Sequence, residues 1–241
     1  MKKIFFKATA AVMLTVAMVI AVGCKKDNSN EENVKLEDVT PPIGGDWVDL
    51  GLPSGLLWAT RNVGATSPED YGDYFAWGET SPKSVYNWSA YRYCNGSMYA
   101  LTKYCCDSTC GYNGFTDSLT TLQPEDDAAT ANWGGGARTP TETEWRELMD
   151  NTTSQWTTQN GVYGRCFTAS NGRSIFLPAA GYRISDYDNV VGSCGYYWSS
   201  SFYTSYPYSA WYLYFDSYPE FYIREDCRYY GHSVRPVRSV R

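Results

Sequence analysis

The chain has 241 residues, a net charge of −6, and an aromatic content of 17% that includes 22 tyrosines. An acidic chain without a basic patch argues against nucleic acid as a partner. Tyrosine has only an intermediate tendency to be buried, so a surplus this large predicts tyrosines at the surface as well as in the core.

Residues 1–23 have the features of a secretory signal peptide. Two lysines precede an apolar stretch that is shorter than the ~20 residues of an ordinary spanning helix. The small residues before Cys24 resemble a bacterial lipobox, in which the signal peptidase cuts before a diacylated cysteine, although Ala21 stands where leucine is usual. An uncleaved membrane anchor and an ordinary signal peptide are the alternatives. We expect a lipoprotein of the outer membrane, anchored through the Cys24 lipid and exposed at the cell surface.

Residues 24–45 are predicted to form a flexible tether. They are polar and charged, and they cannot bury enough apolar surface to offset the entropy of ordering. Clustered core-type residues begin at Trp47. Residues 46–241 are enough for one domain with a sizeable core.

Seven of the eight cysteines follow Cys24 in the chain. An exported chain meets an oxidising environment, so we expect some pairing, with Cys94 and either Cys105 or Cys106 as the local candidates. The cluster from Cys105 to Cys110 has no histidine near it and no second CxxC motif, so we expect no zinc site. We also expect no other metal and no cofactor.

The domain should contain short strands, long loops and one or two helices. Thr141 and Glu144 form a capping box, which predicts a helix starting there. A second short helix should start near Asp126 or Asp127 and run through several alanines. These acidic residues also invite a calcium site, but a helix cap accounts for them more simply. Residues 174–177 are typical of a short buried strand, and the mixture predicts an α+β domain.

Short motifs spread along the domain carry a resemblance to a known family. They are Val48–Thr60, Asn62–Ala65, Tyr74–Thr80, Arg138–Thr141, Glu144–Trp145, Leu177–Arg183, Tyr197–Ser201 and Ser233–Val237. In this order they resemble the FISUMP family, the major paralogous domain of bacterial surface lipoproteins. That family is similar in turn to the C-type-lectin-like fold, in the branch shared with formylglycine-generating enzymes. The resemblance implies terminal strands that pair at the base of the domain and a loop-rich ligand face.

Catalytic chemistry has little support in the sequence. His232 is the only histidine, so a Ser-His-Asp or Cys-His arrangement would depend on it, and we expect it at the surface. The two cysteines of the formylglycine-generating enzymes cannot be mapped onto Cys166, Cys194 or Cys227. We therefore expect a protein that is not an enzyme, with an exported enzyme of that type as the alternative.

Residues 203–232 hold nine tyrosines. Two segments alternate with period two, which predicts one set of side chains in the core and the other on an exposed face. The expected core set is Trp211, Leu213, Phe215, Phe221 and Ile223. The expected outward set is Tyr212, Tyr214, Asp216, Tyr222 and Arg224.

Exposed tyrosines with a few polar groups between them are typical of a paratope, so we expect an adhesin that binds a protein or glycan ligand. Strand propensity is the simpler explanation of the tyrosines, but it does not cover those in loops. The expected ligand-binding residues are Tyr203, Tyr206, Tyr208, Tyr212, Tyr214, Asp216, Tyr218, Tyr222, Arg224, Asp226, Tyr229, Tyr230 and His232. The stretch also resembles the variable region of diversity-generating retroelement targets, in which mutated asparagine codons give Tyr, Ser, Asp, His and Cys.

Overall fold

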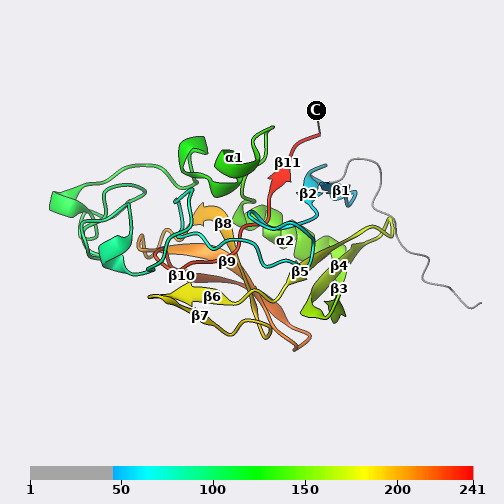
Figure 1. Cartoon of the computed structure of the whole chain (residues 1–241). Coiled ribbons are helices and arrows are strands. Elements are labelled where there is room, and N and C mark those ends of the chain that lie inside the picture. The colour runs from blue at the N-terminus through cyan, green and yellow to red at the C-terminus, as the bar shows by residue number, and fades with distance from the viewer. Residues whose placement is uncertain (1–45, 241) are drawn as a thin grey trace, which may run out of the picture. The chain divides into compact units, whose positions relative to one another are not determined.

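Small antiparallel sheets dominate the described part of the chain, with only two α-helices (Figure 1). The structure is a computed structural model, and it describes residues 46–240. The predicted signal peptide, the predicted lipid anchor at Cys24 and the predicted tether lie outside these residues. All described residues fall within one compact unit, Val39–Arg241, and none of their helices is long and apolar enough to cross a membrane. The coarse α+β expectation is confirmed.

The near-terminal strands share one sheet. Its strands are β1 (Trp47–Asp49), β2 (Leu57–Ala59) and β11 (Val237–Arg238), in the order β1-β2-β11. Val48 and Val237 pair with Trp58 from its two sides, and all three side chains are buried. The beginning and end of the domain therefore lie close together, as expected, but β2 separates them and they do not pair directly.

Three further sheets complete the strand structure. One contains β3 (Thr152–Gln159), β4 (Val162–Ala169) and β5 (Ser174–Pro178), with β4 in the middle. Another contains β8 (Gly195–Phe202), β9 (Ser209–Phe215) and β10 (Phe221–Cys227), with β9 in the middle. A two-stranded hairpin is made of β6 (Tyr182–Ile184) and β7 (Tyr187–Asn189). β5 confirms the strand predicted at residues 174–177.

Both predicted helices are present with their predicted caps. The first, α1 (Ala128–Trp133), begins after Asp127, whose carboxylate accepts from the backbone N–H of Ala129 at 2.8 Å. The second, α2 (Glu142–Asn151), begins with the reciprocal capping box: Glu144 N–H donates to the Thr141 hydroxyl, and Thr141 N–H donates to the Glu144 carboxylate at 2.8 Å. These bonds satisfy backbone donors that have no partner inside the helix.

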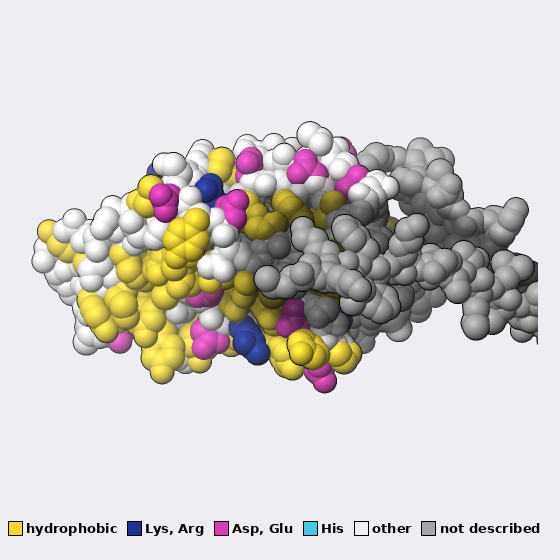
Figure 2. All heavy atoms as spheres, turned by 60° about the horizontal axis from the view of Figure 1, so that its bottom comes forward, with side chains coloured by type: hydrophobic (Ala, Val, Ile, Leu, Met, Phe, Trp, Pro, Cys, Tyr) yellow, Lys and Arg dark blue, Asp and Glu magenta, His cyan; other side chains and the backbone are white. Residues whose placement is uncertain are grey.

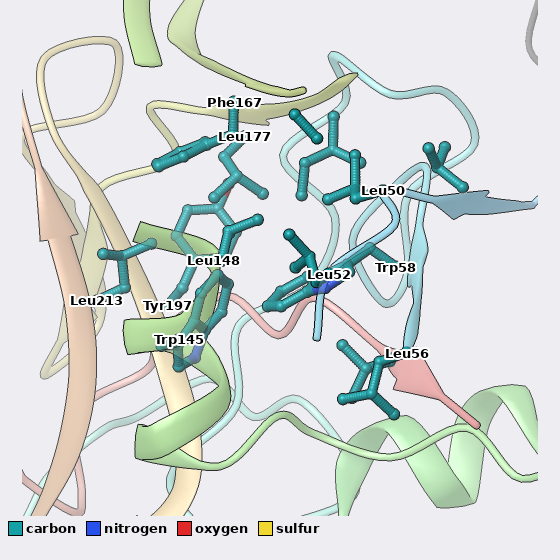
Figure 3. Close-up of a cluster of buried hydrophobic side chains, with 14 of the residues drawn as sticks. Leu50, Leu52, Leu56, Trp58, Trp145, Leu148, Phe167, Leu177, Tyr197 and Leu213 are labelled. Atoms are coloured by element: carbon teal, nitrogen blue, oxygen red, sulfur yellow. The ribbon is translucent and has the colours of Figure 1, made fainter. Parts of the chain in front are cut away.

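The largest hydrophobic core lies where α2 meets three sheets (Figure 3). Trp145 and Leu148 of α2 pack with Trp58 of β2, Leu177 of β5 and Leu213 of β9, all of them buried. A second core on the other side of the β8-β9-β10 sheet includes Trp77, Trp198, Tyr212 and Val234. Both faces of that sheet are therefore covered over much of its area.

Three buried arginines hold loops and strands together through main-chain oxygens. Arg165, Arg228 and Arg235 are each exposed by 1% or less. Arg235 donates at 2.9 Å to the carbonyl oxygens of Ala59 and Phe176 and to the Asn62 side chain. Since guanidinium offers five donors in a fixed fork, one such side chain can fix several carbonyl groups at once.

Candidate tyrosine-rich binding surface

The alternating pattern of β9 and β10 assigns most side chains to the correct face. Leu213 and Phe215 are fully buried, and Phe221 and Ile223 pack partly against the same core. Tyr222 and Arg224 lie on the opposite face and are exposed, as expected. Trp211 is the exception in the expected core set: it is half-buried, and its ring packs edge-on against Tyr203 at 4.7 Å.

The expected exposure of Tyr212 is wrong, because its side chain is only 6% exposed. The residues after β10 return across β8, where Ser233 bridges to Tyr197, and they place the His232 ring 4.9 Å from the Tyr212 ring. The outward face of the sheet is thus covered at one end and open at the other. Exposure rises from buried Tyr212 through half-buried Tyr214 to Tyr222 at 42%.

The expected surface position of His232 is also wrong, since the side chain is completely buried. Its ring stacks on Trp198, with 3.9 Å between centroids, and both ring nitrogens lack a hydrogen-bond partner among the described residues. The Asp226 carboxylate lies 3.5 Å from Nε2, too far for a good hydrogen bond. Burial lowers the pKa of His232 and the Asp226 carboxylate partly opposes this, so the imidazole is neutral at neutral pH.

Five rings form what we call the tyrosine cluster, which comprises Tyr182, Tyr196, Tyr212, Tyr214 and Tyr230. Tyr196 lies at its centre, 4.8 Å from Tyr182, 5.4 Å from Tyr212 and 5.2 Å from Tyr214. Tyr230 joins through Tyr182 at 5.5 Å. All except Tyr212 are half-buried, so part of each of these four side chains reaches solvent.

The cluster lies between β6 and the outward face of β8 and β9, and the exposed residues Tyr222 and Arg224 of β10 continue it. The Arg224 guanidinium lies over the rings of Tyr214 and Tyr222, at 5.1 Å and 4.8 Å from their centroids. Figure 2 shows the side of the domain that carries β6 and β7, where hydrophobic side chains, tyrosine included, gather over a broad area. Only a few acidic and basic side chains interrupt this area.

The remaining predicted site residues fall into separate groups. Tyr203, Tyr206 and Tyr208 lie in the loop between β8 and β9, as expected, and their rings contact one another in sequence. Tyr218 is 70% exposed in the β9–β10 turn. Tyr229 packs on Trp88, with 5.0 Å between centroids, at the edge of a different core, and its ring also contacts Tyr230 of the tyrosine cluster at 4.5 Å.

Asp216 and Asp226 are the acidic residues of the predicted set, and both are half-buried. Asp216 accepts from the Tyr214 hydroxyl at 2.7 Å, which links the cluster to the β9–β10 turn. Asp226 lies beside His232. The predicted residues therefore gather around two groups of rings, the tyrosine cluster and the loop tyrosines Tyr203, Tyr206 and Tyr208, and Tyr218 lies in the β9–β10 turn.

Two members of the cluster, Tyr182 and Tyr196, were not among the expected site residues. Tyr196 alternates with Tyr197 in β8, where Tyr197 is buried in the main core. That alternation was a usable signal in the sequence. Tyr182 reaches the cluster through the pairing of Arg183 with Gly231, a contact between distant segments that has no local signature.

The expected pairing of Cys94 is absent, because all seven cysteines between residues 46 and 240 are free thiols. Cys94, Cys105 and Cys110 nevertheless gather in one small core around Leu101. Within the same range, no group of three or more His, Cys, Asp or Glu side chains could hold a metal ion.

The acidic segment before α1 has protein partners for its carboxylates. Asp127 caps α1 and also accepts from the Thr139 backbone N–H at 2.8 Å. Asp126 accepts from Lys103 and Tyr104 at 2.5 Å, and from the Tyr93 hydroxyl. Structural hydrogen bonds thus account for the residues that had invited a calcium site.

A scan against protein-family models found no matching family. Searches of curated proteins and of solved structures found no match either.

Proposed function

We propose that this chain is a lipid-anchored surface protein that binds a protein or glycan ligand through the tyrosine cluster and its exposed continuation at Tyr222 and Arg224. The observation that carries the proposal is the position of these rings on a firmly packed sheet. Leu213 and Phe215 fix β9 from the core side, while the rings on the other face reach solvent. Rigid aromatic side chains lose little conformational entropy on binding, which makes them effective anchors in an interface.

The fold that we propose is the C-type-lectin-like fold, within the FISUMP family. The presence of β1, β2 and β11 in one sheet supports it, although the resemblance implies terminal strands that pair with each other and here β2 lies between them. The tyrosine-rich strands β9 and β10 belong to a different sheet, so the expected ligand face does not include the terminal strands.

The broad apolar surface supports a binding role independently of the family. Large exposed apolar areas are uncommon on soluble monomers and usually mark interaction sites. Besides Tyr222, the exposed large hydrophobic residues near this side include Tyr187, Val190 and Val191, on or just after β7. Val190 has a φ of 48°, a conformation that is unfavourable for a β-branched residue and that is often retained where function requires it.

The test is a binding screen with the full-length protein against bacterial and host cell surfaces and arrayed glycans. Tyr222→Ala should reduce capture of the ligand, because an aromatic anchor commonly contributes ~2 kcal/mol or more. Tyr163→Ala is the matched control, since Tyr163 is 52% exposed in β4, on a different sheet. Equal loss in both variants, or loss in neither, would refute this surface as the binding site.

We include in the proposal that residues 203–232 belong to a diversified region. The tyrosines at Tyr203, Tyr206, Tyr208 and Tyr218 lie in loops and turns, where changes of side chain do least harm to a fold. Sequencing the flanking DNA tests this idea. A near-duplicate template rich in asparagine codons beside a reverse-transcriptase gene is expected, and a locus without one would contradict it.

A further inference from the structure

The Asp226 carboxylate lies half-buried among aromatic rings without a permanent positive charge beside it. Its Oδ1 accepts from the backbone N–H of Cys227 at 2.8 Å, and its Oδ2 faces His232 at 3.5 Å. Among residues 46–240, His232 is the only ion-pair partner that Asp226 has. Because burial keeps that imidazole neutral, the negative charge of Asp226 is left uncompensated.

The tyrosine cluster lies beside this carboxylate, because the His232 ring that faces Asp226 lies 4.9 Å from the Tyr212 ring and 5.3 Å from the Tyr196 ring. Burial first, and the Asp226 carboxylate second, raise the pKa of both Tyr182 and Tyr212, so the charge lies within electrostatic reach of rings from β6 and β9. Burial is the main cause of the raised pKa values of Tyr196 and Tyr230. The same carboxylate makes a smaller contribution, behind Cys194 and Tyr182 for Tyr196 and behind Tyr229 for Tyr230. The phenols therefore stay neutral.

These rings already accept a cation from within the chain. The guanidinium of Arg224 lies over Tyr214 and Tyr222, on the open side of the cluster. It forms no ion pair with Asp226, although the two residues lie two positions apart on the same face of β10. The arrangement is one carboxylate, several neighbouring aromatic rings and no lysine or arginine paired with that carboxylate within the described residues.

We propose that Asp226 and the tyrosine cluster hold the ammonium group of a cationic ligand. The inference rests on the proposed binding function and names the chemistry of its ligand. Ring faces attract ammonium ions through their quadrupole, and the attraction increases when water is displaced, as in aromatic cages for quaternary amines. A hard metal ion would need more oxygen ligands than one carboxylate and a few phenols provide. An anionic ligand group would be repelled by Asp226.

Choline and its uncharged isostere 3,3-dimethylbutan-1-ol test the charge requirement directly. The purified full-length protein, in a non-ionic detergent, is titrated with each compound, and binding is followed by saturation-transfer NMR of the methyl protons. Choline should bind in the millimolar range and the neutral alcohol should bind roughly tenfold more weakly or not at all. Equal binding of the two, or no binding of choline, would overturn the proposal.

Asp226→Asn should weaken choline binding by about tenfold or more, since it removes the charge and preserves the shape. The matched control is Glu225→Gln, which removes the same charge one residue away, where the strand presents the opposite face. Tyr182→Leu provides a second test from β6, because it removes a ring face and retains much of the volume. Unchanged binding in Asp226→Asn and Tyr182→Leu, with both variants folded by circular dichroism, would refute the site.

Two sources of the ammonium group can be distinguished by comparing N-acetyl-lysine methylamide with its trimethylated form. Tighter binding of the primary amine supports the proposal with a protein lysine as the source. Tighter binding of the trimethylated form supports it with a quaternary, choline-type group. If Asp226→Asn retains capture of the natural ligand while Tyr222→Ala loses it, the cation site is refuted and the binding surface stands. If Asp226→Asn loses capture while Tyr222→Ala retains it, the proposed binding surface alone is refuted.

Discussion

Arg165, in the middle strand of the β3-β4-β5 sheet, donates from Nη2 to the main-chain oxygen of Asp216 at 3.1 Å. The same guanidinium donates to the main-chain oxygens of Pro219, at 3.0 Å, and Tyr218. Its Cζ lies 5.1 Å from the centroid of the Phe221 ring. One buried side chain of a neighbouring sheet therefore fixes the turn between β9 and β10, and with it the open end of the tyrosine-rich face.

Arg165→Met should reduce the free energy of unfolding by about 3 kcal/mol, because several charge-assisted hydrogen bonds are lost while the contact with Phe221 is largely kept. Urea denaturation measures the change. Arg173→Met is the control, since Arg173 is an arginine of the β4–β5 hairpin whose side chain is 41% exposed, and it should shift stability by no more than about 0.5 kcal/mol. Equal effects of the two substitutions would show that Arg165 does not anchor the turn.

Tyr212 and Tyr222 should respond differently to truncation. Tyr212→Ala leaves a cavity beneath His232 and should cost ~3–5 kcal/mol of stability, whereas exposed Tyr222→Ala should stay within about 0.5 kcal/mol. Leu213→Ala, on the opposite face, should cost roughly 2–5 kcal/mol. Thermal or urea unfolding of the three variants checks the assignment of faces. A silent Leu213→Ala together with a destabilising Tyr222→Ala would mean that the faces are reversed.

His232 should make stability depend on pH in the mildly acidic range. In the unfolded chain the imidazole titrates near 6.5, and burial lowers its pKa in the folded protein. As the pH falls below that value the unfolded state takes up the proton first, so the free energy of unfolding decreases, by at most about 1.4 kcal/mol per pH unit. The loss continues until the pH reaches the lowered pKa of the folded state.

Replacing His232 with Phe should flatten stability between about pH 6.5 and pH 5, measured by urea unfolding at fixed pH values. The titration of the Asp126 and Glu144 carboxylates does not contribute to the pH dependence of stability in this pH range. Hydrogen bonds, chiefly from Lys103 and Arg138 respectively, outweigh burial and lower their pKa values, so the stability they provide is lost only at more acidic pH. The same slope in wild type and His232→Phe would contradict the assignment.

The capping box of α2 should contribute measurably to stability. Thr141→Ala removes the hydroxyl that accepts from Glu144 N–H and should cost about 1 kcal/mol. Thr143→Ala, at an exposed position of the same first turn, should change stability by less than about 0.5 kcal/mol. Urea midpoints of the two variants, compared at equal m-values, provide the measurement.

Cys24→Ala should leave a larger precursor and abolish labelling with palmitate, because a lipobox cysteine is both the cleavage point and the lipid acceptor. Metabolic labelling followed by gel electrophoresis is the assay. Cys94→Ala serves as the control and should keep both processing and label. Unchanged labelling of the Cys24 variant would exclude Cys24 as the anchor.

Local signals in the sequence were enough to predict the two helices and the face on which most side chains of β9 and β10 lie. The capping box at Thr141 and the acidic cap at Asp127 fix the starts of both helices, because the bonds they make involve only the next few residues. The alternation around Leu213 and Tyr222 assigns the two faces of the hairpin for the same reason. Each of these features depends on neighbours in sequence.

The errors concern side chains whose surroundings come from distant parts of the chain. Tyr212 and His232 are buried because the segment after β10 returns across β8, where Trp198 stacks on the imidazole. Period two predicts on which face a side chain lies, but it does not indicate what covers that face. Tyr182 entered the site in the same way, through a hairpin whose partner lies nearly fifty residues later, at Gly231.

Arg165 makes contact with the β9–β10 turn almost entirely through backbone atoms, and this has a consequence for evolution. The carbonyl groups of residues 216, 218 and 219 are present whatever side chains those residues carry. Substitutions in the turn can therefore alter its chemistry without removing the bonds that hold it in place. A domain whose turn is held through its backbone can exchange the side chains of that turn while keeping its shape.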